Sequence, residues 1–462
     1  MKAMDVYYKM PAVLRNSAIS VYGAWQAYQR FSGRFRWWYE SLLESQYLTQ
    51  DELECVQLER LRSVLNHAYS TVPYYRQAFD RHGIRPEDVL EVDDLAGLPM
   101  LTRDDVRENL QSLRSSSISA YSPITCMSSG STGQKLQYVL PRDIKRAFNV
   151  AMQWRYYSWA GVHRGDRRAT LGARIFATRP PYFAWNPWEN QLLLSSHHMT
   201  RENMRLYAEL MKRYHVDFIQ GHASAIAVLA EYMLNEDERI PLRGVFTTGE
   251  TVYPNDRDRI ESAFQCRLLD SYGMGESAAA AQQCDRADGY HEISEGCIIE
   301  LEPLGDGTYE VIGTSLLNYA MPFIRYRTGD IAEPADVAQC QCGRGLPLRI
   351  SKVLGRIDDK LVFADRTVLP VTVRMHMKPL LEAGENYQVR QEEPGWVRVI
   401  LTGSVDVARV QQVRSELLSL LPRGTQVSVE HAETITGKNN KIRNVVSLVA
   451  AEEARFRNQA GR

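Results

Sequence analysis

The sequence predicts an α/β protein in two parts, a large N-terminal α/β body with flanking helices and a small, mobile C-terminal α+β domain. Length is the first observation, because 462 residues correspond to two or three domains at about 150 residues each. The second is an alternation of short apolar runs with longer helical stretches between Met127 and Asp330. The third is a change of pattern near Gly355, where the body is expected to end.

The N-terminal segment is expected to be helical. We assign residues 1–100 as a helical extension within a first domain of residues 1–355. Asp51 and Glu52 precede an amphipathic run over residues 56–72, and Pro73 is expected to stop that helix because proline lacks the amide hydrogen.

The alternating region is typical of a sheet with helices on its faces. The expected strands are Leu136–Leu140, Val216–Gln220, Val245–Thr248 and Cys266–Ser271, and the expected helices are Glu202–Tyr214, Ser224–Leu234 and Arg257–Phe264. Ligands of such sheets bind at the carboxyl ends of the strands, so the turns that follow these strands are the place to seek a site.

The second domain is assigned to residues 356–462 and is joined to the body by the turn Gly355–Lys360. It is expected to contain a hairpin near Val362–Leu369, a helix near Met375–Ala383, a strand Val397–Thr402, a helix Val407–Leu420, a strand Gln426–His431 and a lysine-rich tail.

Composition excludes several classes of protein. The 55 basic and 56 acidic side chains give a formal charge of −1, which argues against nucleic acid as a partner. Apolar residues make up 44% of the chain, so a packed core is expected and not disorder. Neither an apolar run of about 18 residues nor a signal peptide is found, and the seven cysteines are an odd number. We therefore expect no transmembrane segment, reduced thiols and a cytoplasmic location.

The segment Met127–Lys135 combines two glycines with hydroxyl side chains and ends in a lysine. Exposed backbone amides and hydroxyls in such a turn can cradle an anion. The segment lacks the glycine spacing of a Walker loop. On composition alone, a phosphate-binding loop and a flexible linker remain equal alternatives.

Further motifs decide between these alternatives. They are Thr247–Glu250, Asp270–Glu276, Tyr326–Asp330, Gly355–Asp359 and Thr436–Arg443, together with Val72–Arg76 and Leu98–Arg103 near the N-terminus. In this order and spacing they resemble the adenylate-forming superfamily of acyl-CoA synthetases and adenylation domains. The branch with the greatest similarity is the phenylacetate–CoA ligase-like one, in particular its CapK-like proteins of capsular polysaccharide biosynthesis. The resemblance covers nearly the whole chain.

The resemblance implies an ATP-dependent acid–thiol ligase. It would convert a carboxylic acid, aryl or apolar, to an acyl-AMP with release of pyrophosphate and then transfer the acyl group to the thiol of CoA. One alternative is amide formation on an amine such as an amino sugar, or transfer to a carrier protein in trans, without CoA. Another is an inactive nucleotide-binding scaffold.

The resemblance also implies an ATP site. Its residues would be Ser128, Ser129, Gly130, Ser131, Thr132, Gly133, Lys135, Thr248, Gly249, Glu250, Ser271, Tyr272, Gly273, Asp330 and Arg356. Asp330 would bind both ribose hydroxyls, and Tyr272 would stack near the adenine. The loop departs from the family at Lys135, where a proline is common.

The residues implied for catalysis lie at three places in the chain. Glu276 would bind Mg²⁺, together with Thr132. A tail lysine would bridge the carboxylate and the α-phosphate; Lys441 fits the family ending better than Lys438, and both remain candidates. Asp358 would be the hinge of the small domain.

A zinc site and an acyl pocket complete the expectations. Cys284, His291, Cys340 and Cys342 make up a tetrahedral donor set, with Cys297 as the alternative ligand. Spacing alone leaves zinc and reduced thiols open, and the resemblance favours a structural Zn²⁺. The acyl pocket is assigned to Phe176, Tyr182 and Trp185 in an expected loop over residues 174–199, with His222 and Ala278. Ordinary packing is the alternative for these aromatic residues.

Overall fold

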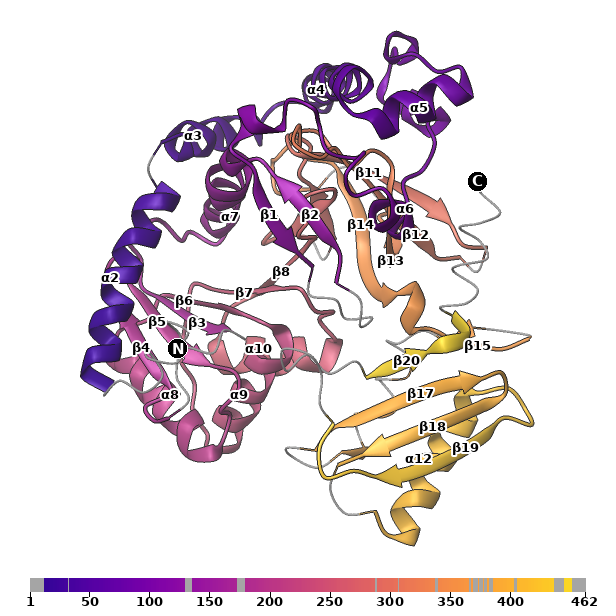
Figure 1. The fold of residues 1–462 in the computed structure, drawn as a ribbon. Coiled ribbons are helices and arrows are strands. Elements are labelled where there is room, and N and C mark those ends of the chain that lie inside the picture. Colours follow the sequence, from indigo (N-terminus) through magenta and orange to yellow (C-terminus); the bar gives the residue numbers. More distant parts are fainter. Residues whose placement is uncertain are drawn as a thin grey trace.

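A computed structural model describes most of the chain (Figure 1). The described residues are 12–31, 33–128, 135–172, 179–286, 289–305, 307–336, 340–364, 367–368, 373, 377, 380–381, 385–402, 405–435 and 444–450. No helix within these ranges is both long and apolar enough to cross a membrane.

A 12-stranded sheet forms the centre of the body, in the order β11-β12-β13-β14-β10-β9-β8-β7-β6-β3-β5-β4. Its strands are β3 (Arg168–Gly172), β4 (Phe183–Asn186), β5 (Gln191–Ser195), β6 (Phe218–Gly221), β7 (Gly244–Thr248), β8 (Leu268–Gly273), β9 (Ala280–Gln283), β10 (Tyr290–Glu292), β11 (Cys297–Pro303), β12 (Tyr309–Ser315), β13 (Tyr326–Pro334) and β14 (Leu348–Arg356). The run β5-β3-β6-β7-β8 is parallel.

The parallel strands are connected by helices, as the alternating pattern predicted. These are α8 (Arg201–Arg213), α9 (Ala223–Asn235) and α10 (Pro254–Phe264). Successive strand side chains point to opposite faces. On β6, Ile219 packs into the cluster that contains these three helices, whereas Phe218 packs into a second cluster with the helix α7 (Asn149–Ser158). Both faces of the parallel region are therefore covered.

The N-terminal residues are helical, as predicted, where the structure describes them. The longer helices are α2 (Ala12–Phe31), α3 (Phe35–Ser45), α4 (Gln50–Thr71), α5 (Pro73–His82) and α6 (Arg103–Glu108), with short turns η1 (Pro86–Asp88), η2 (Val92–Gly97), η3 (Ile118–Tyr121) and η4 (Ile144–Phe148). Helix α4 begins with a capping box between Thr49 and Glu52. Pro73 does more than end that helix, because it is the first residue of α5.

One local expectation was wrong. The segment over residues 174–199 was expected to be a loop, because its prolines disfavour a helix. Its described part contains β4 and β5, which pair antiparallel. The prolines bracket β4 instead of interrupting it, so four residues with alternating exposure are left free to pair at the sheet edge.

The C-terminal residues form a separate four-stranded sheet in the order β19-β18-β17-β20, which lies beside the body in Figure 1. Its elements are β17 (Tyr387–Glu393), β18 (Trp396–Leu401), α12 (Val407–Leu420), β19 (Gln426–His431) and β20 (Val445–Ser447), preceded by η5 (Ile357–Asp359), β15 (Leu361–Val362) and β16 (Thr367–Val368). Their hydrophobic cluster uses residues from Leu361 onward. The boundary at residue 355 stays a prediction, and most of the expected helix near residues 375–383 lies outside the described residues.

Candidate functional site

The carboxyl ends of the parallel strands surround one cavity of about 570 Å³. The last residues of four parallel strands line this cavity. They are Gly172 of β3, Gly221 of β6, Thr248 of β7 and Gly273 of β8. The predicted ATP residues Ser271 and Tyr272 and the predicted acyl residue His222 also line it. The fold therefore brings residues from distant motifs to the edge of the sheet at which ligands bind in this class.

Tyr272, Asp330 and Arg356 form a hydrogen-bonded cluster at this edge. The Tyr272 hydroxyl donates to Asp330 Oδ2 at 2.9 Å, and Arg356 Nε lies 3.1 Å from Asp330 Oδ1. Asp330 and Arg356 are directly paired in the register of β13 and β14, which explains how residues so far apart in the sequence meet. Both carboxylate oxygens are thus held in place by neighbours.

Glu276 is buried close to this cluster. Burial raises the pKa of its carboxyl, whereas the nearby Arg103 and Arg356 act to lower it. A Cβ at the preceding Gly275 would collide with the hydroxyl of Tyr138, so glycine is required at that close approach. A buried carboxylate that favours neutrality is a group that a bound cation would stabilise in its ionised form, and its hard oxygens fit Mg²⁺.

The predicted phosphate loop connects β1 (Ile124–Met127) to β2 (Gln137–Leu140). Its two ends are fastened together, because Ser128 N donates to Leu136 O at 2.8 Å and Leu136 N donates to Ser128 Oγ at 2.9 Å. Lys135 is exposed at the same end. The predicted residues Ser129, Gly130, Ser131, Thr132 and Gly133 lie outside the described residues.

Glu250 has a structural partner. Its Oε2 accepts hydrogen bonds from the backbone amide of Ser224 at 3.1 Å and from the Ser224 hydroxyl at 2.6 Å. These contacts pair a backbone amide in the first turn of α9, where the N-cap residue His222 forms no side-chain hydrogen bond of its own. Gly249, just before it, has a φ of +76°, which glycine adopts without strain.

Of the predicted acyl residues that the structure describes, one lines the cavity and the others do not. His222 lines the cavity, and its Nδ1 lies 3.2 Å from Thr248 O. Trp185 and Tyr182 are not among the lining residues, and they stack on Tyr214 and on His198 respectively. Ala278 is fully buried outside the lining, although its neighbours Ala279 and Ala280 line the cavity; Phe176 lies outside the described residues.

Lys438 and Lys441 lie outside the described residues, and the backbone of Asp358 belongs to the short turn η5. Gly355, just ahead of that turn, has a φ of +124°, which only glycine adopts readily.

Sequence reasoning missed three polar residues near the site. Arg103 begins α6, lies 3.4 Å from Ser128 Oγ through its Nη2 and influences the carboxyl of Glu276. The motif Leu98–Arg103 was a usable signal for it, since the resemblance already included that motif. Thr170 and Gln220 line the cavity from β3 and β6, and no motif indicated them.

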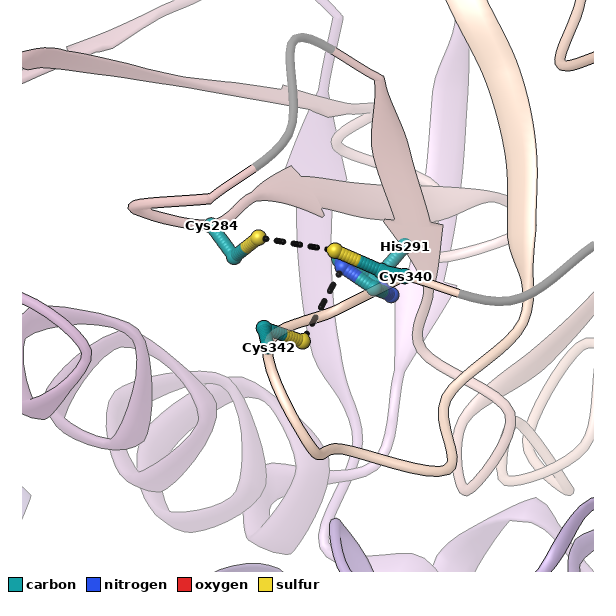
Figure 2. Close-up of side chains that lie close together, drawn as sticks. All are labelled: Cys284, His291, Cys340 and Cys342. Atoms are coloured by element: carbon teal, nitrogen blue, oxygen red, sulfur yellow. Dashed lines mark hydrogen bonds between the residues drawn. The ribbon is translucent and has the colours of Figure 1, made fainter. Parts of the chain in front are cut away.

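Four of the predicted metal ligands converge in a second cluster (Figure 2). Their ligand atoms all lie within 4.8 Å of one another in Cys284, His291, Cys340 and Cys342. Cys284 Sγ is 3.5 Å from Cys340 Sγ, and Cys342 Sγ is 3.7 Å from His291 Nε2. Cys297 is not part of this group; its thiol contacts the backbone of Ala280.

The donor set fits a tetrahedral zinc ion. His291 Nδ1 lies 2.7 Å from Leu346 O, so the other ring nitrogen, Nε2, is directed to the thiols as a metal ligand requires. Hydrogen bonding by the Cys284 thiol lowers the pKa of Cys342, and the same contact raises the pKa of Cys284. A cation would remove this asymmetry by stabilising all the thiolates.

The chain is similar to known proteins over most of its length. It is 22% identical to protein CapK of Staphylococcus aureus over 376 residues, which are 79% of this chain and 80% of CapK. It is 28% identical to a phenylacetate–CoA ligase of Pseudomonas putida over 363 residues, covering 73% of this chain and 78% of that one.

A solved structure shares the fold. This is 2-hydroxyisobutyryl-CoA ligase in its postadenylation state, with a TM-score of 0.64, 18% identity and coverage of 90% of this chain and 94% of that one. No established family profile matches the chain. The relatives and the shared fold confirm the resemblance to adenylate-forming enzymes of the phenylacetate–CoA ligase-like and CapK branch.

Proposed function

We propose that this protein activates a carboxylic acid with ATP as an acyl adenylate and transfers the acyl group to CoA. The observation that carries the proposal is the meeting of Tyr272, which lines the strand-end cavity, with Asp330 and Arg356 close to the buried Glu276. The similarity to phenylacetate–CoA ligases and CapK supports it.

In the first half-reaction a carboxylate oxygen attacks the α-phosphorus of ATP, the bond to the β-phosphate oxygen breaks, and pyrophosphate leaves. Both reactants are anions, so the site must position them and reduce their repulsion. We assign Asp330 to the ribose hydroxyls, with Arg356 and Tyr272 holding its two oxygens in place. The loop from Ser128 to Lys135 is assigned to the phosphates.

Glu276, with Thr132, is assigned to hold Mg²⁺, which when bound screens the charge of the triphosphate. Lys441 is assigned to the reacting oxygens, with Lys438 as the alternative, and Asp358 to the hinge that moves this lysine. Each of these roles stays a prediction, as does a cytoplasmic location.

In the second half-reaction the CoA thiolate attacks the acyl carbon, and AMP leaves with the electron pair of the broken bond. An amine or a carrier-protein thiol in place of CoA is the alternative acceptor. An inactive scaffold is disfavoured, because Glu276, Asp330, Arg356 and a tail lysine are all present in the sequence.

We further propose that Cys284, His291, Cys340 and Cys342 hold a structural zinc ion. The three thiols and the imidazole fill a tetrahedral coordination sphere and leave no position for substrate. The ion would fasten residues 340–342, which lie between β13 and β14, to the β9–β10 hairpin.

The test is ATP–pyrophosphate exchange with a panel of carboxylic acids, followed by thioester formation with CoA. We expect exchange with at least one acid. Lys441→Ala should lower exchange by about a hundredfold or more and leave ATP binding intact, whereas Lys438→Ala, a matched neighbouring change, should lower it much less. Equal exchange rates in Lys441→Ala and wild type would reject the assignment of Lys441. If none of the acids stimulated ATP–pyrophosphate exchange, the proposed function would be rejected.

A further inference from the structure

The cavity at the strand ends has an apolar wall and a polar wall. Phe148, Met152 and Phe246 contribute the apolar side. The polar side includes Thr170 and Gln220, which are adjacent in the register of β3 and β6 and project to the same face of the sheet. Among the described lining residues none is an Asp or a Glu, and Lys145, which is exposed, is the one Lys or Arg.

Thr170 and Gln220 belong to a fixed hydrogen-bond network. Thr170 Oγ1 accepts from Gln191 Nε2 at 2.7 Å and from Gln220 Nε2 at 3.1 Å. Gln220 Oε1 in turn accepts from the hydroxyl of Tyr157 and, at 3.5 Å, from Gln153 Nε2. These contacts fix the orientation of the Gln220 amide and occupy both acceptor positions of the Thr170 hydroxyl.

The Thr170 hydroxyl and the Gln220 amide can each still donate a hydrogen bond. With its lone pairs occupied, the Thr170 hydroxyl has only its proton left to offer, and no described residue accepts it. The Gln220 amide likewise has a second hydrogen beyond the one directed to Thr170. Two neighbouring donors on a cavity wall match a ligand atom that accepts hydrogen bonds.

Donors in a cavity wall select against a hydrocarbon ligand. Such a ligand would leave the remaining donor hydrogens of Thr170 and Gln220 unpaired, whereas a ligand oxygen that reaches them removes that penalty.

We propose that the acid activated here carries a neutral oxygen-bearing group, a hydroxyl, carbonyl or ether, which accepts hydrogen bonds from Thr170 and Gln220. The inference rests on the proposed adenylation activity. It narrows the expectation of an aryl or apolar acid to one that carries an oxygen group, and it disfavours acids with an ammonium group because no described carboxylate faces the cavity. The apolar wall would hold the hydrocarbon part of the same molecule.

The test uses the full chain and pairs of acids that differ only by a methyl and an oxygen group of similar size. Suitable pairs are 4-methyl- and 4-hydroxyphenylacetate, 4-ethyl- and 4-methoxyphenylacetate, and 3-methyl- and 3-hydroxybutanoate. We expect the oxygen-bearing member of at least one pair to have a kcat/KM for exchange at least tenfold higher. Equal or better use of the methyl member in every pair would overturn the proposal while leaving the adenylation activity established.

Two variants of Thr170 sharpen the test. Thr170→Val keeps the volume and removes the hydroxyl, so the preference for the oxygen-bearing acid should fall about tenfold, mainly through KM. Thr170→Ser keeps the hydroxyl and should retain the preference, which also controls for damage to the fold. A loss of both members to the same degree in Thr170→Val would contradict the proposal.

Binding separates this proposal from the proposed function. If no acid supports exchange, adenylation fails, and calorimetric titration of the same pairs still measures the preference of the cavity. Tighter binding of an oxygen-bearing member, lost in Thr170→Val, would support the inference; absence of any preference, or of any binding, would overturn it.

Discussion

Two clusters of polar side chains on the same sheet differ in how they meet solvent. In the cluster of Tyr272, Asp330 and Arg356, Tyr272 lines the strand-end cavity, and the side chain of Arg356 is 33% exposed. In the Cys/His cluster of residues 284, 291, 340 and 342, His291 is fully buried, and none of the four residues lines that cavity. The first cluster therefore has a side chain in the wall of the cavity, whereas the second cluster is separate from that cavity.

The difference teaches how one sheet can combine chemistry with local stability. Asp330 and Arg356 are positioned by the pairing of β13 and β14, and Tyr272 reaches Asp330 from β8. The Cys/His cluster brings together residues from three separate places in the chain, and a metal bound there would couple them. Changes in the first cluster should therefore affect activity, and changes in the second should affect stability.

The largest effect is expected at the Cys/His cluster. Cys342→Ser, or treatment with a chelator, should lower the free energy of unfolding by roughly 3 kcal/mol or more, because the remaining ligands, among them the buried His291, would lose the proposed cation. The melting temperature and the zinc content of the purified protein are the measurements.

The control for this change is Cys55→Ser, since Cys55 is an exposed thiol remote from the cluster in sequence. It should alter neither zinc content nor melting temperature. The absence of zinc from gently purified wild-type protein would contradict the proposed metal site.

A smaller effect, on activity, is expected at the strand ends. Asp330→Asn keeps the shape of the side chain and removes the charge that pairs with Arg356, so ATP–pyrophosphate exchange should fall about ten- to a hundredfold. The melting temperature should change little. Asp336→Asn, at an exposed acid beyond the end of β13, is the matched control. A large loss of stability with unchanged exchange would invert the comparison.

The smallest effect concerns pH. Asp270 lies beneath the strand ends, where its carboxylate accepts from Thr247 Oγ1 at 2.5 Å and from the Tyr290 hydroxyl at 2.7 Å, and burial raises its pKa to about 6. The folded protein therefore binds this proton more tightly than the unfolded chain does. Its contribution to stability is full below the ordinary carboxyl pKa of about 4 and is lost as the pH rises through about 6.

Comparison with Asp270→Asn isolates this contribution. The stability of wild type relative to the variant should fall by about 2 kcal/mol between pH 4 and pH 7, a change that the variant, which cannot ionise, does not share. Urea unfolding at several pH values measures it. A relative stability that is constant or rises with pH would show that Asp270 is ionised at no cost in the fold.

Local sequence was sufficient for much of the fold. Helix α12 and strand β19 have the predicted bounds, because each is short-range, continuous in its pattern and bounded by turn residues. The order of the motifs pointed to the strand ends, and the cysteine and histidine positions, read with the family resemblance, pointed to the four side chains that the structure brings together. Such features depend on periodicity and on residue types that have few other uses.

Pairing across the sheet was decided by the tertiary structure. Sequence did not reveal that Asp330 faces Arg356, that Glu250 caps α9, or that Trp185 packs on Tyr214 away from the cavity. Thr170 and Gln220 are ordinary strand residues until strand register makes them neighbours. The amino-acid sequence by itself determined which chemistry was available, and only the packing of strands from distant parts of the chain decided which side chains share a cavity, because contacts of that kind leave no periodic trace in a single sequence.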